Sequence, residues 1–186
     1  MVDFDGFLNL RFLSFGYCDL TGQIPAYLSK NLEELALNNN RIRGPIPSWL
    51  GTLPRLRSMD LSSNLISGEF PKELCGLPML VSKQTVAQVD SNDLELPVYT
   101  TSGVLVASQI NFRYIRPTID ISMNIMSGKI PIEIGQLRLL HGLYLSNNNF
   151  SGNIPEQISK LKNLEKLDRS LRESFVRKNP TIIDNP

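Results

Sequence analysis

One sixteen-residue pattern recurs along this chain and constrains its fold more than any other feature. The pattern is L-x-x-L-x-L-x-x-N-x-L-x-G-x-I-P, where x is any residue. Its five copies, numbered repeats 1 to 5 below, occupy residues 10–25, 32–47, 56–71, 116–131 and 140–155. Repeats 4 and 5 follow one another at the same spacing as repeats 2 and 3. A regular period of about 24 residues predicts a solenoid, in which each repeat packs only against its neighbours.

Each position of the pattern has a structural reason. The x-L-x-L-x stretch alternates, so it predicts a short strand whose leucines point inward. A buried Asn can bond the backbone of neighbouring turns through its amide and its carbonyl, while Gly allows a tight path and Pro fixes the next bend. The segments between copies, such as 48–53 and 132–137, are predicted to be short helices on the convex side. The fold class expected is therefore an α/β solenoid with a short parallel concave sheet.

The outward positions of these strands form the predicted concave face. They are Phe12, Ser14, Gly16, Glu34, Ala36, Asn38, Ser58, Asp60, Ser62, Thr118, Asp120, Ser122, Gly142, Tyr144 and Ser146. Most are small and polar, with an acidic trace at Asp60 and Asp120. Such a face suits hydrogen bonding to a peptide backbone, and the binding candidates on it are Ser58, Asp60, Thr118, Asp120 and Tyr144. The alternative is a sheet face that is merely solvated.

The repeat frame is interrupted once. A new copy is expected at Leu80, but the frame resumes only at Arg116. The chain thus divides into repeats at 1–80, an inserted island at 81–115, repeats with the start of a sixth at 116–168, and a tail at 169–186. β-Branched and aromatic residues on both sides of a Ser-Gly pair at 102–103 predict two short strands within the island. A mobile loop is the alternative.

The G-x-I-P ending of the repeats resembles plant extracellular leucine-rich repeats. The island adds a Glu-Leu-Pro-Val-Tyr element at 95–99 and a return through Pro-Thr-Ile at 117–119, which are similar to receptors for tyrosine-sulfated peptides, such as the phytosulfokine and sulfated-glycopeptide receptors. The resemblance implies an ectodomain fragment of a plant receptor kinase or receptor-like protein in growth or defence signalling. It also implies the extracellular side of the plasma membrane, a small secreted sulfated peptide as ligand, and a co-receptor of leucine-rich-repeat type.

The resemblance further implies that the peptide adds a strand to the island and that basic groups hold its sulfate. The residues expected to contact peptide are Leu96, Val98, Tyr99 and Thr100 along the island edge, with Lys83, Arg113 and Arg116 as sulfate donors. Solvated surface charge is the alternative for the three basic residues.

Other functions find little support in the sequence. A formal net charge of +1 does not favour a nucleic-acid partner, and no apolar run is long enough to span a membrane. No signal peptide, kinase motif, cofactor motif or metal motif is present, so we expect a binding protein and not an enzyme. Asn149-Phe150-Ser151 is an N-glycosylation sequon. The alternative function is a membrane-free interaction module, such as a decoy, a co-receptor piece or a defence protein of the enzyme-inhibitor type.

The C-terminal region and the cysteines carry two further predictions. A sixth copy starts at Leu164 but has Arg169 where an inward Leu belongs. Leucines at three- and four-residue spacing predict an amphipathic helix from Ser159 to Lys178 that caps the last repeat, followed by disorder. Cys18, which replaces the Asn of repeat 1, and Cys75 are expected to be buried or half-buried thiols.

Overall fold

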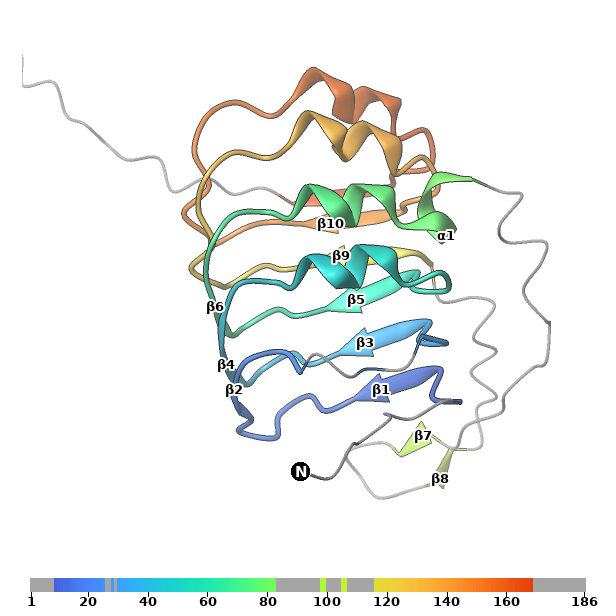
Figure 1. The fold of residues 1–186 in the computed structure, drawn as a ribbon, viewed down its shortest axis with the longest axis vertical. Coiled ribbons are helices and arrows are strands. Elements are labelled where there is room, and N and C mark those ends of the chain that lie inside the picture. Colours follow the sequence, from blue (N-terminus) through green and yellow to red (C-terminus); the bar gives the residue numbers. More distant parts are fainter. Residues whose placement is uncertain are drawn as a thin grey trace, which may run out of the picture.

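The turns of this chain stack into a solenoid (Figure 1). A computed structural model describes residues 9–25, 28, 30–82, 98–99, 105–106 and 116–168. Its concave side carries a parallel sheet of six strands within the described residues, in the order β1-β3-β5-β9-β10-β11. The strands are β1 (Phe12–Ser14), β3 (Glu34–Ala36), β5 (Ser58–Asp60), β9 (Thr118–Asp120), β10 (Gly142–Tyr144) and β11 (Lys166–Asp168). The fold class predicted from the repeats is confirmed.

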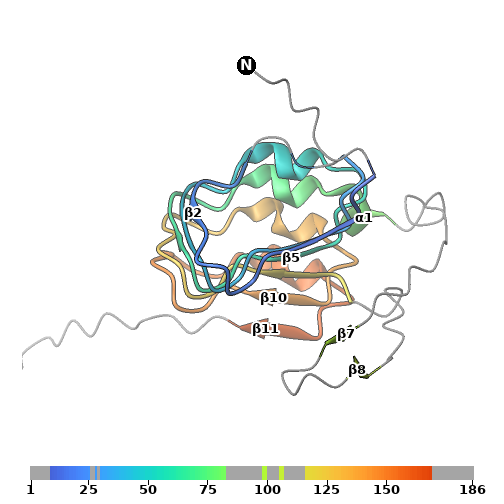
Figure 2. The ribbon, with the colours of Figure 1, turned by 90° about the horizontal axis from the view of Figure 1, so that it is seen from below.

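Short 3-10 helices return the chain along the convex side, opposite the sheet (Figures 1 and 2). They are η1 (Ser48–Thr52), η2 (Lys72–Gly76), η4 (Ile132–Gln136) and η5 (Glu156–Lys160). The Pro that ends each of repeats 2 to 5 is the N-cap of one of these helices. A single α-helical turn, α1 (Pro78–Val81), follows η2. On the lateral side, between sheet and helices, β2 (Thr21–Gly22), β4 (Arg41–Gly44) and β6 (Leu65–Ile66) form a second parallel sheet.

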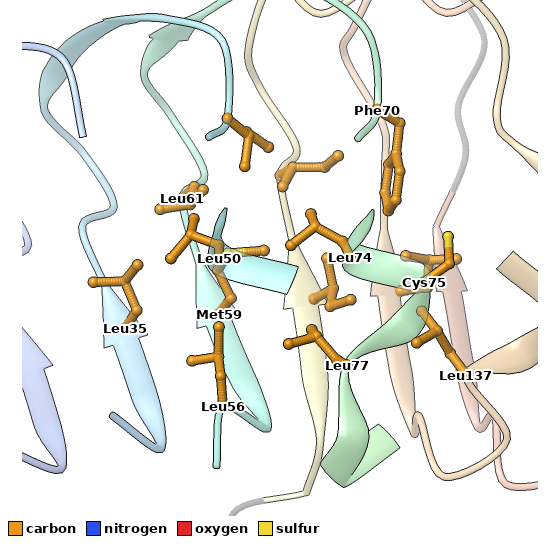
Figure 3. Close-up of a cluster of buried hydrophobic side chains, with 14 of the residues drawn as sticks. Leu35, Leu50, Leu56, Met59, Leu61, Phe70, Leu74, Cys75, Leu77 and Leu137 are labelled. Carbon is orange, nitrogen blue, oxygen red and sulfur yellow. The ribbon is translucent and has the colours of Figure 1, made fainter. Parts of the chain in front are cut away.

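The leucine positions of the pattern form one continuous core. In Figure 3, Leu35, Met59 and Leu61 point from neighbouring strands toward Leu50 and Leu74 of the convex turns. All five are at most 1% exposed. Burying such a side chain stabilises the folded state by about 1.5–3 kcal/mol. The alternation predicted from the sequence therefore places the leucines correctly.

The pattern asparagines bind consecutive turns together. Asn64 donates from Nδ2 to the carbonyl of Leu37 in the previous repeat (2.9 Å) and to Leu61 in its own (3.1 Å). Its Oδ1 accepts the backbone N–H of Ile42 (3.0 Å). The pattern recurs at Asn40, Asn124 and Asn148. These amides thus satisfy backbone groups that would otherwise be buried without partners.

The two cysteines differ in their surroundings. Cys75 is fully buried, as predicted, but Cys18 is exposed, so the prediction for Cys18 is wrong. The turn of repeat 1 relies on the next repeat, because Asn40 Oδ1 accepts the backbone N–H of Cys18 (3.1 Å). Cys18 lies in the outermost turn that the structure describes, where no earlier repeat covers it.

The helix predicted from Ser159 to Lys178 is wrong over its described part. η5 ends at Lys160, and β11 continues the parallel sheet, with Leu167 opposite Leu143. The spacing of these leucines is that of the repeat pattern, in which the first two leucines of a copy are three residues apart. The rest of that helix, and the tail from 169, lie outside the described residues.

Two strands of the predicted island are described. β7 (Val98–Tyr99) and β8 (Leu105–Val106) pair antiparallel, with Val98 opposite Val106. This confirms the two short strands on either side of the Ser-Gly pair. The remainder of 83–115 lies outside the described residues, and the island boundaries stay a prediction.

Candidate functional site

The junction between repeats 3 and 4, called the seam below, closes without a break in the sheet. β5 pairs directly with β9, so that Met59 faces Ile119 and Asp60 faces Asp120. Repeats 4 and 5 follow one another directly in the chain, and β9 pairs with β10 at the same strand positions. The additional residues between repeats 3 and 4 are therefore accommodated without a shift of the register.

Leu80 is the last residue of the repeat frame before the inserted segment. It stands where the copy after repeat 3 is expected to begin, has no exposed surface, and its carbonyl accepts the backbone N–H of Leu139 (2.9 Å). Arg116, the first residue of repeat 4, occupies the same pattern position and is exposed. The core position is thus filled by Leu80 before the inserted segment (residues 81–115, the island of the sequence analysis, called the excursion below). Arg116, two residues before β9, resumes the repeat.

Charged side chains line this edge of the sheet, one residue before β1, β3, β5 and β11 and two residues before β9. Glu33, whose side chain is 5% exposed, accepts a hydrogen bond from Arg11 Nε (2.7 Å) and faces Arg57 Nε at 3.8 Å. Farther along, Arg116 pairs with Glu165. Sequence reasoning missed the Arg11–Glu33–Arg57 set. Its signal was available, because all three residues occupy the second position of their copies.

Carboxylates line the middle of the concave face. Oδ1 of Asp60 accepts the backbone N–H and hydroxyl of Ser62 (3.0 and 2.7 Å), and Asp120 is held by Ser122 in the same way (2.9 and 2.7 Å). On the last strand, Asp168 accepts the hydroxyl of Ser146 (2.7 Å). The acidic trace predicted from Asp60 and Asp120 is one file, since the two face each other in register.

Burial perturbs two acids of this face. Desolvation raises the pKa of Asp120, the Asp60 and Asp168 carboxylates raise it further, and the bonds from Ser122 oppose the shift. Desolvation also raises the pKa of Glu34, against the attraction of a neighbouring guanidinium. One carboxylate oxygen of Glu34 is buried without a hydrogen-bond partner. The face thus carries negative charge that water screens incompletely.

The remaining concave candidates lie near the seam. Ser58 and Thr118 face each other, and the Thr118 hydroxyl donates to the carbonyl of Arg116 (2.9 Å). Tyr144 belongs to the next strand, where Gly142 makes room for its ring, because a Cβ on Gly142 would lie 3.1 Å from Tyr144 Cε2. The structure therefore brings Ser58, Thr118 and Tyr144 together on three adjacent strands.

The island candidates are placed only in part. Val98 and Tyr99 form β7, and Arg116 lies at the seam, while Lys83, Leu96, Thr100 and Arg113 lie outside the described residues. Asn149 is exposed on the lateral side, away from the concave face. In the described part of the chain, no group of three acidic, His or Cys side chains fits a metal ion. No helix there has the length and apolar character needed to cross a bilayer.

Two family descriptions match the repeats. Leucine rich repeat descriptions cover residues 30–82 in one case, and residues 9–30 and 139–161 in the other. The chain belongs to the leucine-rich-repeat proteins. Over 143 residues (76% of this chain) it is 36% identical to Receptor-like protein 7 of Arabidopsis thaliana, and over 151 residues (79%) it is 44% identical to Receptor-like protein 3 of the same plant. These repeats are therefore of the plant receptor-like type.

Solved structures agree with this family. The plant peptide hormone receptor RGFR1, in complex with RGF2, superposes with a TM-score of 0.58 at 28% identity, over 82% of this chain and 18% of that one. This leucine-rich-repeat chain spans only 13% and 20% of the two curated relatives. The sulfated-peptide subtype expected from the island is a finer assignment that stays a prediction.

Proposed function

We propose that this chain is part of the ligand-binding ectodomain of a plant cell-surface receptor, and that it binds an extended peptide beside the seam. The observation that carries the proposal is the in-register pairing of β5 with β9 across the excursion. An insertion that leaves the sheet intact and emerges at its edge adds a second surface next to the concave face. The likeness to a receptor solved with its peptide hormone supports the same conclusion.

The chemistry of the two surfaces suggests how the peptide is oriented. Carboxylates of Asp60 and Asp120 occupy the face, while the edge carries basic side chains, including Arg116, that are paired with the acidic Glu33 and Glu165. A peptide lying across both would direct N–H groups or a basic side chain toward the carboxylates and an anionic group toward the edge. A tyrosine sulfate is the anionic group that we propose, held by Arg116 together with Lys83 and Arg113.

Strand addition is the proposed source of affinity at the excursion. A peptide strand would pair with β7 or β8, and main-chain hydrogen bonds of this kind give affinity with little dependence on sequence. Selectivity would come from Leu96, Val98, Tyr99 and Thr100 on the island and from Ser58, Thr118 and Tyr144 on the concave face. A co-receptor of the same repeat class is the further partner that we propose.

The test is calorimetric titration of the full chain with secreted plant peptides, each synthesised in a tyrosine-sulfated and an unsulfated form. For the peptide that binds, we expect the double variant Asp60→Asn/Asp120→Asn and the variant Arg116→Gln each to weaken affinity about tenfold. Glu73→Gln, an exposed carboxylate on convex η2, is the matched control and should change nothing.

Two outcomes separate the parts of the proposal. Equal affinity for the sulfated and unsulfated forms would exclude the sulfate contact and leave peptide binding intact. Equal affinity of the concave double variant and the Glu73→Gln control would remove the concave face from the site.

A further inference from the structure

The lateral side of the solenoid carries an exposed apolar patch at the seam. It consists of Leu65, Met123 and Ile125, which are 37%, 56% and 50% exposed. Met123 and Ile125 are two residues apart in repeat 4, and Leu65 belongs to repeat 3. The two turns are adjacent at this point, because the backbone N–H of Ile125 bonds the carbonyl of Ile66, the residue after Leu65 (3.0 Å).

The patch departs from the chemistry of the same positions in most of the other repeats. At the eighth pattern position, Met123 stands where repeats 2, 3 and 5 have Asn39, Ser63 and Asn147, and only repeat 1 also has a large side chain there, the exposed Tyr17. All five have positive φ, between 53° and 58°, a conformation that Asn tolerates better than Met. At the tenth position, Leu65 and Ile125 stand where repeats 1, 2 and 5 have Asp19, Arg41 and Asn149. Met123 Sδ accepts a hydrogen bond from the Ser63 hydroxyl (3.4 Å), and the apolar surface of all three side chains stays partly in solvent.

The next residue along this file is Asn149, the acceptor of the sequon. The backbone N–H of Asn149 donates to the carbonyl of Met126 (2.7 Å), the same cross-turn bond that Ile125 makes to Ile66. Asn149 is therefore the neighbour of Ile125 one turn farther along the solenoid. It is exposed, and Phe150 beside it is buried and fixes the turn.

We infer that an N-linked glycan on Asn149 covers the patch formed by Leu65, Met123 and Ile125. The amide nitrogen of Asn149 bonds to the anomeric carbon of the first N-acetylglucosamine of a lipid-linked oligosaccharide. The bond from that carbon to the diphosphate oxygen breaks, the nitrogen loses a proton, and the lipid diphosphate leaves. Pyranose rings present C–H faces that pack on aliphatic side chains, while their hydroxyls stay in water.

The position of the acceptor favours this occupant over a protein partner. A glycan attached one turn from Ile125 is held at high local concentration over the patch. An exposed cluster of apolar side chains favours association, and a group that covers it opposes that tendency. The bulky, solubilising glycan removes that liability on the lateral side of the seam.

The test uses the full chain, secreted from a plant host behind a signal peptide. Mass spectrometry measures occupancy of Asn149, and the fluorescence of an apolar-surface dye measures exposure of the patch. We expect dye fluorescence to rise about twofold when the glycan is removed by Ser151→Ala or Asn149→Gln. Enzymatic trimming of the folded glycoprotein to one N-acetylglucosamine should give an intermediate rise in dye fluorescence. Because this experiment needs no substitution, it tests the inference even if a variant fails to fold.

Two matched controls decide whether the coverage is local. In the Asn149→Gln background, Gln136→Asn with Arg138→Thr moves the sequon to η4 on the convex side, and both of these residues are exposed. This distant glycan should leave the dye signal high. Replacing the patch by Met123→Asn and Ile125→Arg, residues found at these positions in other repeats, should abolish the rise.

Three results would overturn the inference. They are an unoccupied Asn149 in the secreted chain, a distant glycan that lowers dye binding as much as the native one, and an unchanged rise in the polar patch variant.

Discussion

The seam between repeats 3 and 4 and the uninterrupted junction between repeats 4 and 5 differ in connectivity, yet their concave sides are nearly identical. At the seam, Asn124 donates across to Leu61 and accepts from Ile66, at 3.0 and 2.9 Å. At the uninterrupted junction, Asn148 makes the same two bonds at 2.9 and 3.0 Å. The hydrogen bonds between consecutive turns are thus specified by residues within each repeat, and not by the way in which the chain connects the repeats.

The convex sides are not identical. A Cβ on Gly51 of η1 would lie 2.3 Å from the carbonyl oxygen of Glu73, and one on Gly135 would lie 2.6 Å from that of Gln157. At the seam, the equivalent residue of η2 is Cys75, which is fully buried. Burial raises the pKa of its thiol to about 12, so the neutral thiol is the form that packs. Convex spacing therefore depends on the size of one side chain, while concave spacing follows backbone pairing.

The largest effect is expected from the asparagines. Asn124→Ala and Asn148→Ala should each lower the free energy of unfolding by about 3 kcal/mol, because several buried backbone groups lose their partner. Urea denaturation checks this, with the exposed Asn153→Ala as control. If the seam variant cost much less than Asn148→Ala, the two junctions would not be equivalent.

A smaller effect is expected on the convex side. Gly51→Ala should cost about 2 kcal/mol, because the new methyl group meets the backbone of η2. Cys75→Ala only vacates space and should cost about 1 kcal/mol. Urea denaturation of both variants measures the difference. A smaller cost for Gly51→Ala than for Cys75→Ala would contradict the spacing argument.

Excision of the excursion should change stability less. Deleting residues 81–116, which are the excursion together with Arg116, joins Leu80 to Pro117 and restores the regular repeat period. The deletion removes a loop-closure cost and loses the exposed Arg116–Glu165 pair, so we expect a net change below about 2 kcal/mol. Thermal unfolding measures it, and peptide binding should be lost. Failure of the excised chain to fold would show that the excursion stabilises the seam.

The smallest effect is expected from Asp120→Asn. The folded-state pKa of Asp120 is raised, so its charge disfavours folding at neutral pH, and that penalty disappears as pH falls through the raised pKa toward the ordinary value of 3.8. The variant should gain less than about 1 kcal/mol at pH 7 and nothing below pH 3.8. Thermal unfolding at several pH values tests this. A loss of stability at pH 7 would mean that the bonds from Ser122 outweigh the burial.

The sheet register could be predicted from the sequence because every repeat carries its own register marks. Counting from the first residue of each copy, Leu56 and Arg116, predicts the alignment of β5 with β9, whatever lies between them. The leucines at the end of the repeats led to the wrong prediction of a helix, because the spacing of Leu161, Leu164 and Leu167 fits both a helix and the repeat. The existing sheet decided the outcome, because β10 offers β11 an edge to pair with.

The edge charges and the lateral patch could not be predicted by the same counting. Glu33 meets Arg11 and Arg57 of the copies on either side, and this contact is seen only when equal positions of successive copies are compared. The concave candidates Asp60, Asp120 and Tyr144 were predicted because strand alternation alone determines which side they face. Contacts made by the island depend on its own tertiary packing, which no repeat specifies.

The buried Leu80 and its exposed counterpart Arg116 have a consequence for how such proteins diversify. A segment can be inserted between the first and the second residue of a repeat without disturbing the pairing of the concave strands. Gene rearrangement could therefore exchange whole recognition modules at this point while selection on folding stays relaxed. The same boundary offers protein engineers a grafting site for foreign binding loops.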